Sequence, residues 1–377
     1  MLSIHWFLPT GGDSRDVATS GPDTHRREPD VPYLAQVARA ADRLGFEAAL
    51  TPCGTACEDA WIATAPLIPL TERLAFLVAF RPGLLSPTLA AQMASTYQRM
   101  SGGRLRLNIV IGAEDAESAR FGPPIDKATR YARAAEFLQV MRAAWGEEPF
   151  DFRGEFYDVT AATTRARPEP PPPVYFGGAS PPAEEVAARW SDVYLAWGEP
   201  TAMVAERVDR MRQKAADVGR TLRYGIRFHV ITRPTAEAAW AAAEQLLAGV
   251  KPEQVAAARA DFAATASEGQ RRMAELHRDL DPTDVRGLEI HPNLWAGVGL
   301  VRGGAGTTLV GSHTEVADRI EEYAALGFEE FILSGYPHLE EAYWCGEGLL
   351  PELRRRGCLA PLPGDTAPAE SRFSTFR

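Results

Sequence analysis

The chain has 377 residues, of which 45% are hydrophobic and 24% are charged, a composition typical of a soluble globular protein. Its formal net charge of −10 and the lack of a basic stripe argue against a nucleic-acid partner. No apolar run has membrane-spanning length, and no basic segment followed by an apolar core opens the chain. We therefore expect no membrane partner, no secretory signal and a cytoplasmic location.

Runs of strand-forming residues recur along the chain and alternate with segments of helical periodicity. The strand-like runs are residues 3–8, 47–51, 74–80, 105–111, 173–177, 192–197, 224–231 and 329–334. Helices are expected at 34–44, 87–100, 127–145 and 314–326. Eight strands alternating with helices is the count of a closed parallel barrel. We predict an α/β protein, a (β/α)8 barrel, with a single domain over residues 1–358.

Two gaps between strands can hold insertions, because such a barrel needs only roughly 250 residues. The gap at about 146–172 contains a possible hairpin at 150–157 and a proline-rich connector. The gap at about 235–310 begins with Ala-rich helical runs and ends in a glycine-rich stretch around Arg302. Glycines around one arginine predict a mobile loop that presents a charge, which suits a lid. Residues 359–377, rich in Pro, Ala, Ser and Thr, are expected to be disordered.

The strand-like run 224–231 carries two polar residues where a structural strand is normally apolar. Side chains alternate along a strand, so Arg227 and His229 share one face and Ile226, Phe228 and Val230 share the other. Burying an unpaired guanidinium is unfavourable by roughly several kcal/mol of folding free energy. The two cations therefore indicate a binding site if the strand is central, or a solvated face if it lies at an edge.

Cys57 follows the second strand. Thr55 and Glu58 have the spacing of a capping box, which would place Cys57 in the first turn of the next helix and lower its thiol pKa. The alternative is a small, half-buried residue at a helix start. Four cysteines are too few for a disulfide framework, and their spacing does not complete a zinc ligand set, so we expect no metal.

The ends of the later strands offer further polar groups. Gly178 and Ser180 follow the fifth strand, where backbone amides and a hydroxyl at a helix start can hold a phosphate. A plain turn with an N-cap has the same pattern. Trp197 ends the sixth strand and Tyr336 follows the eighth. Because active sites of parallel barrels form at the carboxyl ends of the strands, this joint placement favours an enzyme.

Several segments resemble the bacterial-luciferase-like flavin monooxygenases, and within them the alkanesulfonate monooxygenase family. The resemblance runs from about residue 3 to about 352. Its most specific segments are Phe7-Leu-Pro-Thr, Cys57-Glu-Asp-Ala-Trp, Arg81-Pro, Leu195-Ala-Trp-Gly-Glu-Pro, Arg227-Phe-His, residues 293–306 and Ser334-Gly-Tyr-Pro-His-Leu-Glu-Glu-Ala-Tyr343. It implies a luciferase-like TIM barrel that takes reduced FMN (FMNH2) from a separate NAD(P)H-dependent FMN reductase. It further implies that O2 is used to cleave the C–S bond of an alkanesulfonate, giving aldehyde and sulfite. A homodimer or homotetramer is also implied.

The resemblance assigns roles to individual residues. The positions that match its functional residues are Cys57, Trp197, Arg227, His229, Arg302 and Tyr336, with Tyr131 and Ser180 as phosphate ligands. Arg227 and His229 are expected to hold the sulfonate, Arg302 to close the site, and Tyr336 to donate a proton or hydrogen bond. Trp197 would form one wall of the flavin site, and Cys57 would adjust flavin affinity through a hydrogen bond.

One departure concerns substrate range. Where the family has a histidine after Phe7-Leu-Pro-Thr, this chain has Gly11-Gly12. Alternatives therefore remain. The protein could be a related flavin monooxygenase acting on methanesulfonate, dimethyl sulfone, a long alkane or an aldehyde. It could also be an F420-dependent oxidoreductase of the same fold, or a flavin-binding relative without activity.

Overall fold

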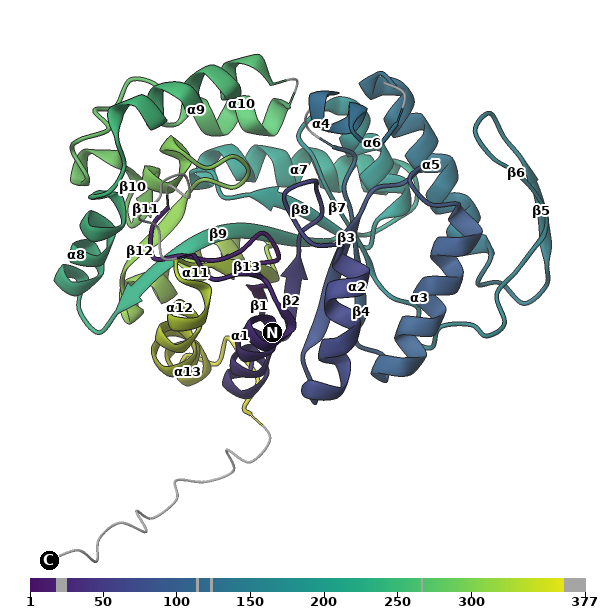
Figure 1. Cartoon of the computed structure of the whole chain (residues 1–377), viewed down its shortest axis with the longest axis horizontal. Helices are drawn as coiled ribbons and strands as arrows, with labels where there is room; N and C mark the ends of the chain where they lie inside the picture. The colour runs from purple at the N-terminus through teal and green to yellow at the C-terminus, as the bar shows by residue number, and fades with distance from the viewer. Residues whose placement is uncertain (18–25, 113–114, 123–124, 266, 363–377) are drawn as a thin grey trace, which may run out of the picture.

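The protein forms a closed eight-stranded parallel barrel with helices around it, as predicted (Figure 1). The computed structural model describes residues 1–17, 26–112, 115–122, 125–265 and 267–362. The predicted disordered tail lies almost wholly outside these residues. No helix in the described part is long and apolar enough to cross a membrane.

The barrel strands follow one another around the ring in chain order, and all eight coincide with predicted runs. They are β1 (Ser3–Phe7), β2 (Ala48–Thr51), β3 (Ala75–Phe80), β4 (Leu105–Ile109), β7 (Val174–Gly177), β8 (Val193–Trp197), β9 (Arg223–Arg233) and β13 (Glu330–Ser334). Parallel pairing of β13 with both β1 and β9 closes the ring. Each β-strand is covered from outside, so its two faces are both buried, one in the barrel interior and one under helices.

Helices connect the strands and cover the barrel. They are α1 (Val31–Leu44), α2 (Ala60–Thr64), α3 (Pro87–Ser101), α4 (Asp115–Ala119), α5 (Lys127–Ala143), α6 (Pro181–Trp190), α7 (Thr201–Asp217), α8 (Ala236–Leu247), α9 (Pro252–Ala264), α10 (Glu268–Glu275), α11 (His313–Ala325), α12 (His338–Trp344) and α13 (Leu350–Arg355). Sequence-encoded caps fix their ends: the Ser86 side chain accepts a hydrogen bond at the start of α3, and Gly45 ends α1 in the left-handed conformation.

Two segments depart from the simple barrel. The antiparallel strands β5 (Phe150–Arg153) and β6 (Asp158–Ala162) form the expected hairpin, which projects from the right edge of Figure 1. Between β9 and β13, α8 is followed by α9 and α10. Three strands that the sequence did not predict come next: β10 (Glu289–His291), β11 (Leu294–Trp295) and β12 (Thr308–Ser312). β12 pairs with the carboxyl half of the long strand β9, so this insertion extends the barrel sheet next to Arg227 and His229.

The barrel interior is apolar in its middle and polar at its amino end. Leu50, Leu77 and Ile332 belong to the buried interior cluster. Below them, His5 Nε2 lies 3.0 Å from a carboxylate oxygen of Glu330, which also accepts hydrogen bonds from Tyr175 and Arg223. Burial raises the pKa of Glu330, but these donors outweigh burial and lower this pKa to about 2. The amino end of the barrel is therefore filled by a network of charged groups that neutralise one another.

Candidate functional site

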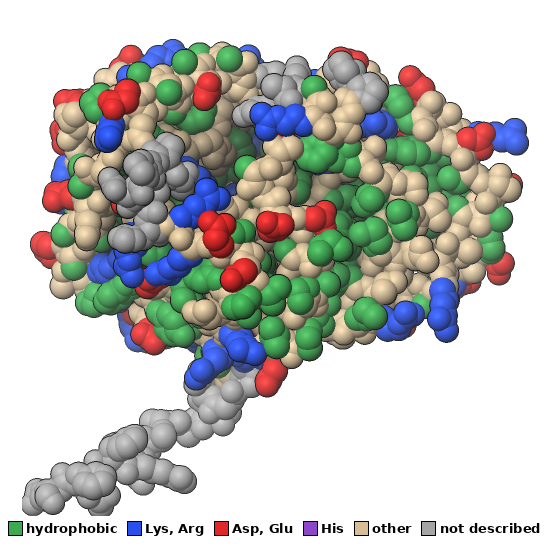
Figure 2. All heavy atoms as spheres, viewed as in Figure 1, with side chains coloured by type: hydrophobic (Ala, Val, Ile, Leu, Met, Phe, Trp, Pro, Cys, Tyr) green, Lys and Arg blue, Asp and Glu red, His purple; other side chains and the backbone are tan. Residues whose placement is uncertain are grey.

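A cavity of about 210 Å³ opens at the carboxyl ends of the barrel strands. Figure 2 shows that this face of the molecule is hollowed beside the lobe that α9 and α10 form. The cavity is lined by residues 108–112, Lys127, Tyr131, residues 177–180, residues 195–197, Glu199, Arg207, Arg227, residues 267–269 and Ile332. The cofactor candidates Tyr131, Gly178, Ser180 and Trp197 thus line one cavity, together with Arg227.

One end of the cavity has the properties of a phosphate site. Ser180 is the N-cap of α6, and its Oγ lies 3.5 Å from the hydroxyl of Tyr131. Burial raises the pKa of Tyr131, so its hydroxyl stays protonated and can donate. A Cβ at Gly178, whose φ is +150°, would lie 2.5 Å from the Cβ of Ala183, so only glycine lets the backbone take this path.

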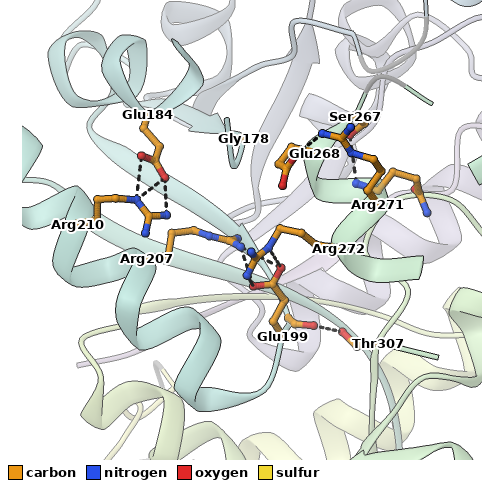
Figure 3. Close-up of polar contacts among 12 residues, drawn as sticks. Gly178, Glu184, Glu199, Arg207, Arg210, Ser267, Glu268, Arg271, Arg272 and Thr307 are labelled. Atoms are coloured by element: carbon orange, nitrogen blue, oxygen red, sulfur yellow. Dashed lines mark hydrogen bonds and ion pairs between the residues drawn. The ribbon is translucent and has the colours of Figure 1, made fainter. Parts of the chain in front are cut away.

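Acidic groups near this end are neutralised. Figure 3 shows Glu184, in the first turn of α6, facing Arg210. The two side chains make three hydrogen bonds of 2.8–3.1 Å, so the buried carboxylate has its counter-charge. A bound phosphate at the start of α6 would therefore meet the positive helix end without an unpaired acid beside it.

The other end of the cavity is aromatic and covered by the insertion. Trp197 lies against α10, because a Cβ at Gly269 would come within 3.0 Å of its ring. Leu195, Ile332 and residues 109–111 add apolar surface beside Trp197. This side of the cavity suits a flat heterocycle, and α10, which sequence patterns did not connect with the site, forms part of its wall.

A buried ion triad joins that insertion helix to the barrel. Glu199 accepts two hydrogen bonds from Arg207, at 2.9 and 2.7 Å, and two from Arg272 of α10, at 2.7 and 2.9 Å (Figure 3). Burial raises the pKa of Glu199, but the two arginines outweigh burial and lower this pKa. Nothing in the sequence alone indicates this triad, since its members become neighbours only through the fold.

Arg227 lies in the barrel interior, in register with Trp197 and Ile332. Its guanidinium carbon is 4.4 Å from the ring centroid of Phe7. In the part of the chain that the structure describes, no carboxylate pairs with it, and its Nε has no hydrogen-bond acceptor. Burial, with a smaller effect of Arg302, lowers its pKa to about 10. The expected unpaired cation is therefore present, next to the cofactor cavity.

His229 lies on the same face of β9, but it is not a cation at neutral pH. Burial and the charge of Arg227 lower its pKa well below the ordinary value. Its Nδ1 is 2.9 Å from Ser334 Oγ, and its ring stacks on Tyr336 with centroids 5.4 Å apart. The expectation of two cations on β9 is corrected: a neutral imidazole beside an arginine is the form that a low-dielectric site permits.

Arg302 also reaches this cluster. Its guanidinium lies over the Tyr336 ring, 5.6 Å from the centroid. The 301–306 segment is held by α10, because the amide of Gly304 donates to Gln270 Oε1 at 2.7 Å. The structure thus brings Arg227, His229, Arg302 and Tyr336 together at one mouth.

Cys57 faces the same mouth, yet its predicted helical position and acidity are wrong. The helix α2 begins at Ala60 with Asp59 as its N-cap, and the amide of Thr55 donates instead to Glu117 at 2.9 Å. Cys57 therefore lies in the turn before the helix. Burial raises the pKa of its thiol, and nearby Thr10 and Arg302 only partly oppose this. A half-buried thiol can donate or accept a hydrogen bond here, but it is not a thiolate.

A further group at the mouth was not assigned from the sequence. His338 Nδ1 lies 2.9 Å from a carboxylate oxygen of the buried Asp13. The imidazole ring of His338 packs against Phe7 and Tyr336, with centroids 5.3 and 5.2 Å away. The two residues stand 325 positions apart, and only the closed barrel, which pairs β1 with β13, makes them neighbours.

The fold and this site define a (β/α)8 barrel with a cofactor cavity beside a cationic mouth. The luciferase-like monooxygenase family matches residues 2–330, and the chain belongs to that family. It is therefore an enzyme of the luciferase-like monooxygenase class.

Solved structures share the whole architecture. One of riboflavin lyase (RcaE), with modified FMN and riboflavin, has a TM-score of 0.79 and 21% identity, covering 96% of this chain and 93% of that chain. EDTA monooxygenase (EmoA) from Chelativorans sp. BNC1 has a TM-score of 0.76 and 18% identity, covering 95% of each chain. DmoA from Hyphomicrobium sulfonivorans has a TM-score of 0.74 and 18% identity, covering 94% and 88%. At these identities the likeness concerns the fold.

Proposed function

We propose that the protein is an FMNH2- and O2-dependent monooxygenase that cleaves the C–S bond of an alkanesulfonate, receiving reduced FMN from a separate NAD(P)H-dependent reductase. The observation that carries the proposal is Arg227, a partly buried arginine without an acidic partner in the described structure, which lines the cofactor cavity and the cationic mouth at once. An anionic substrate supplies the missing counter-charge next to the cofactor.

The residues that line the cavity suit FMN. Tyr131, Ser180 and the Gly178 backbone would hold the phosphate, and Trp197 with its apolar neighbours would face the isoalloxazine. When bound, reduced FMN supplies the two electrons that reduce O2. Pro181 and Pro182 lack N–H groups, so the amide donors available at the start of α6 are those of residues 179, 180 and 183.

The chemistry at the mouth suits a sulfonate. A sulfonate stays ionised at physiological pH and has oxygens that accept from guanidinium donors, so Arg227 and Arg302 would bind it beside the neutral ring of His229. The overall reaction balances as RCH2SO3⁻ + FMNH2 + O2 giving RCHO + HSO3⁻ + FMN + H2O. Tyr336 contacts both His229 and Arg302 and would donate a hydrogen bond or proton.

The same observation ranks the alternatives. Methanesulfonate carries the same charge and satisfies Arg227 equally. Neutral dimethyl sulfone or an alkane would displace water from the guanidinium without supplying a counter-charge, which is unfavourable. An F420-dependent reaction would transfer hydride without consuming O2.

The test is a coupled assay with an FMN reductase, NADH and air, in which sulfite is measured for short and long alkanesulfonates and for dimethyl sulfone. We expect sulfite from at least one sulfonate and none from the sulfone. Arg227→Met should abolish sulfite release. The matched control is Arg223→Met, on the same face of the same strand but paired with Glu330, which should retain it. Absence of sulfite from every sulfonate, with O2 and FMNH2 supplied, would refute the proposal.

A further inference from the structure

The two guanidinium groups at the mouth have aromatic rings where a carboxylate would be usual. Arg227 lies on Phe7, and Arg302 lies over Tyr336. Cation–π contacts hold a cation while leaving its N–H donors available, but they do so only if the rings keep their positions. What fixes these two rings therefore fixes the anion site.

Both rings pack on the same imidazole. His338 is 3% exposed, and its ring contacts both Phe7 and Tyr336. Its own position is set by Asp13, which accepts from the backbone N–H of His338 at 2.8 Å and binds its Nδ1 at 2.9 Å. A carboxylate bound to Nδ1 fixes the tautomer and the ring orientation of a histidine.

Asp13 is held as an ionised group. Tyr33 donates a hydrogen bond to its second oxygen, and burial with the nearby Asp13 charge raises the pKa of Tyr33, so that this donor stays protonated. Burial opposes ionisation of Asp13, but His338 and Tyr33 lower its pKa below the ordinary value. Among the described residues, the buried carboxylate of Asp13 is thus connected to the cations of the mouth through His338 and the two rings.

The loop that carries Asp13 has no space for another imidazole. A Cβ at Gly11 would lie 2.9 Å from the carbonyl oxygen of Ala56, a backbone atom that cannot move aside, and 3.7 Å from Cys57 Sγ. A histidine at this position would therefore require the backbone around Ala56 to shift, and among the described residues His338 supplies an imidazole beside Phe7 and Tyr336.

We propose that Tyr33, Asp13 and His338 form a positioning chain, in which Asp13 anchors the His338 ring and His338 holds the Phe7 and Tyr336 rings that support Arg227 and Arg302. Asp13 and Tyr33 are positioning residues, since they act on Arg227, Arg302 and the two rings through His338. The proposal rests on the proposed function in that the cations must bind an anionic substrate.

Asp13→Asn tests it, because asparagine keeps the size of the side chain but loses the charge and one acceptor. We expect kcat/KM for the sulfonate to fall about tenfold to a hundredfold, mainly through KM, as for loss of a buried charged hydrogen bond. FMN affinity should stay within about twofold, since the chain does not line the FMN cavity. Tyr33→Phe, which leaves the Asp13–His338 pair intact, should change KM in the same direction but less.

The matched control is Glu330→Gln, which weakens the other buried histidine–carboxylate contact at the opposite end of the barrel. It should lower stability and leave KM unchanged. A crystal structure of Asp13→Asn gives a readout that needs no turnover: His338, Tyr336 and Arg302 should be displaced. The proposal would be overturned if the rings keep their positions in Asp13→Asn. It would also be overturned if Asp13→Asn changes KM no more than Glu330→Gln does. Absence of sulfite in the wild type would refute the proposed function and leave the structural readout decisive.

Discussion

Replacing Arg227 by methionine should stabilise the protein while it abolishes activity. The side chain is partly buried at the wall of the cavity, it has no carboxylate partner in the described structure, and desolvation lowers its pKa to about 10. At about 1.4 kcal/mol for each pKa unit, the free energy of keeping this charge in the folded state is about 3 kcal/mol. Water can reach part of the side chain through the cavity, and methionine replaces most of its apolar contacts, so we expect a gain of about 1–3 kcal/mol in the free energy of unfolding.

The assay is urea unfolding at neutral pH, followed by circular dichroism, with Arg207→Met as the matched control. Arg207 is a buried arginine of the same cavity wall, and it is paired with Glu199 at 2.9 and 2.7 Å. Its removal leaves the buried carboxylate with Arg272 alone and should destabilise by roughly 1–3 kcal/mol. The two substitutions should therefore have opposite signs. If Arg227→Met destabilises as much as Arg207→Met does, Arg227 is a structural residue and the reasoning is wrong.

Four further predictions concern single sites. Gly178→Ala should weaken FMN binding about tenfold or more because the backbone must move, whereas Gly219→Ala, where φ is +69° and the space is open, should leave FMN affinity unchanged in the same fluorescence titration. Arg302→Ala should keep FMN affinity but replace sulfite by H2O2 as the product of O2 consumption; an unchanged sulfite yield would contradict the lid role. Because the pKa of Glu330 falls to about 2 on folding, the stability it contributes is present above its ordinary pKa and is lost as pH falls toward about 2, so Glu330→Gln should flatten acid unfolding in that window. Because burial raises the pKa of Cys57, its alkylation by iodoacetamide at neutral pH should be slower than that of glutathione, and a faster rate would restore the thiolate hypothesis.

The sequence was sufficient for the barrel because parallel strands buried on both faces are continuous apolar runs. All eight runs became barrel strands, and caps such as Ser86 and Gly45 marked helix ends. The strands β10 and β11 were not predicted, since each is only two or three residues long and has no periodicity to detect. The helix after Cys57 was misplaced because Asp59 competes with Thr55 as N-cap, and local sequence does not decide between two good caps.

For the site, sequence pattern predicted which residues face the interior but not their charge states. Alternation along 224–231 correctly put Arg227 and His229 on one face. The neutral form of His229 follows from its burial beside Arg227, which no single strand reveals. Contacts made by α10 with Trp197 and with the 301–306 segment depend on how the insertion folds back over the barrel, so they could be found only in three dimensions.

One strand shows how the same residue type serves the fold at one end and chemistry at the other. Arg223 and Arg227 lie four residues apart on the interior face of β9. Arg223 meets the carboxylate of Glu330 within the compensated network at the amino end, which stabilises the barrel. Arg227 meets an aromatic ring and a cavity at the carboxyl end, where its uncompensated charge destabilises the fold and is available to a ligand. Because an eight-stranded barrel leaves its carboxyl ends to loops, it can keep an unpaired cation there while the amino end supplies the stability.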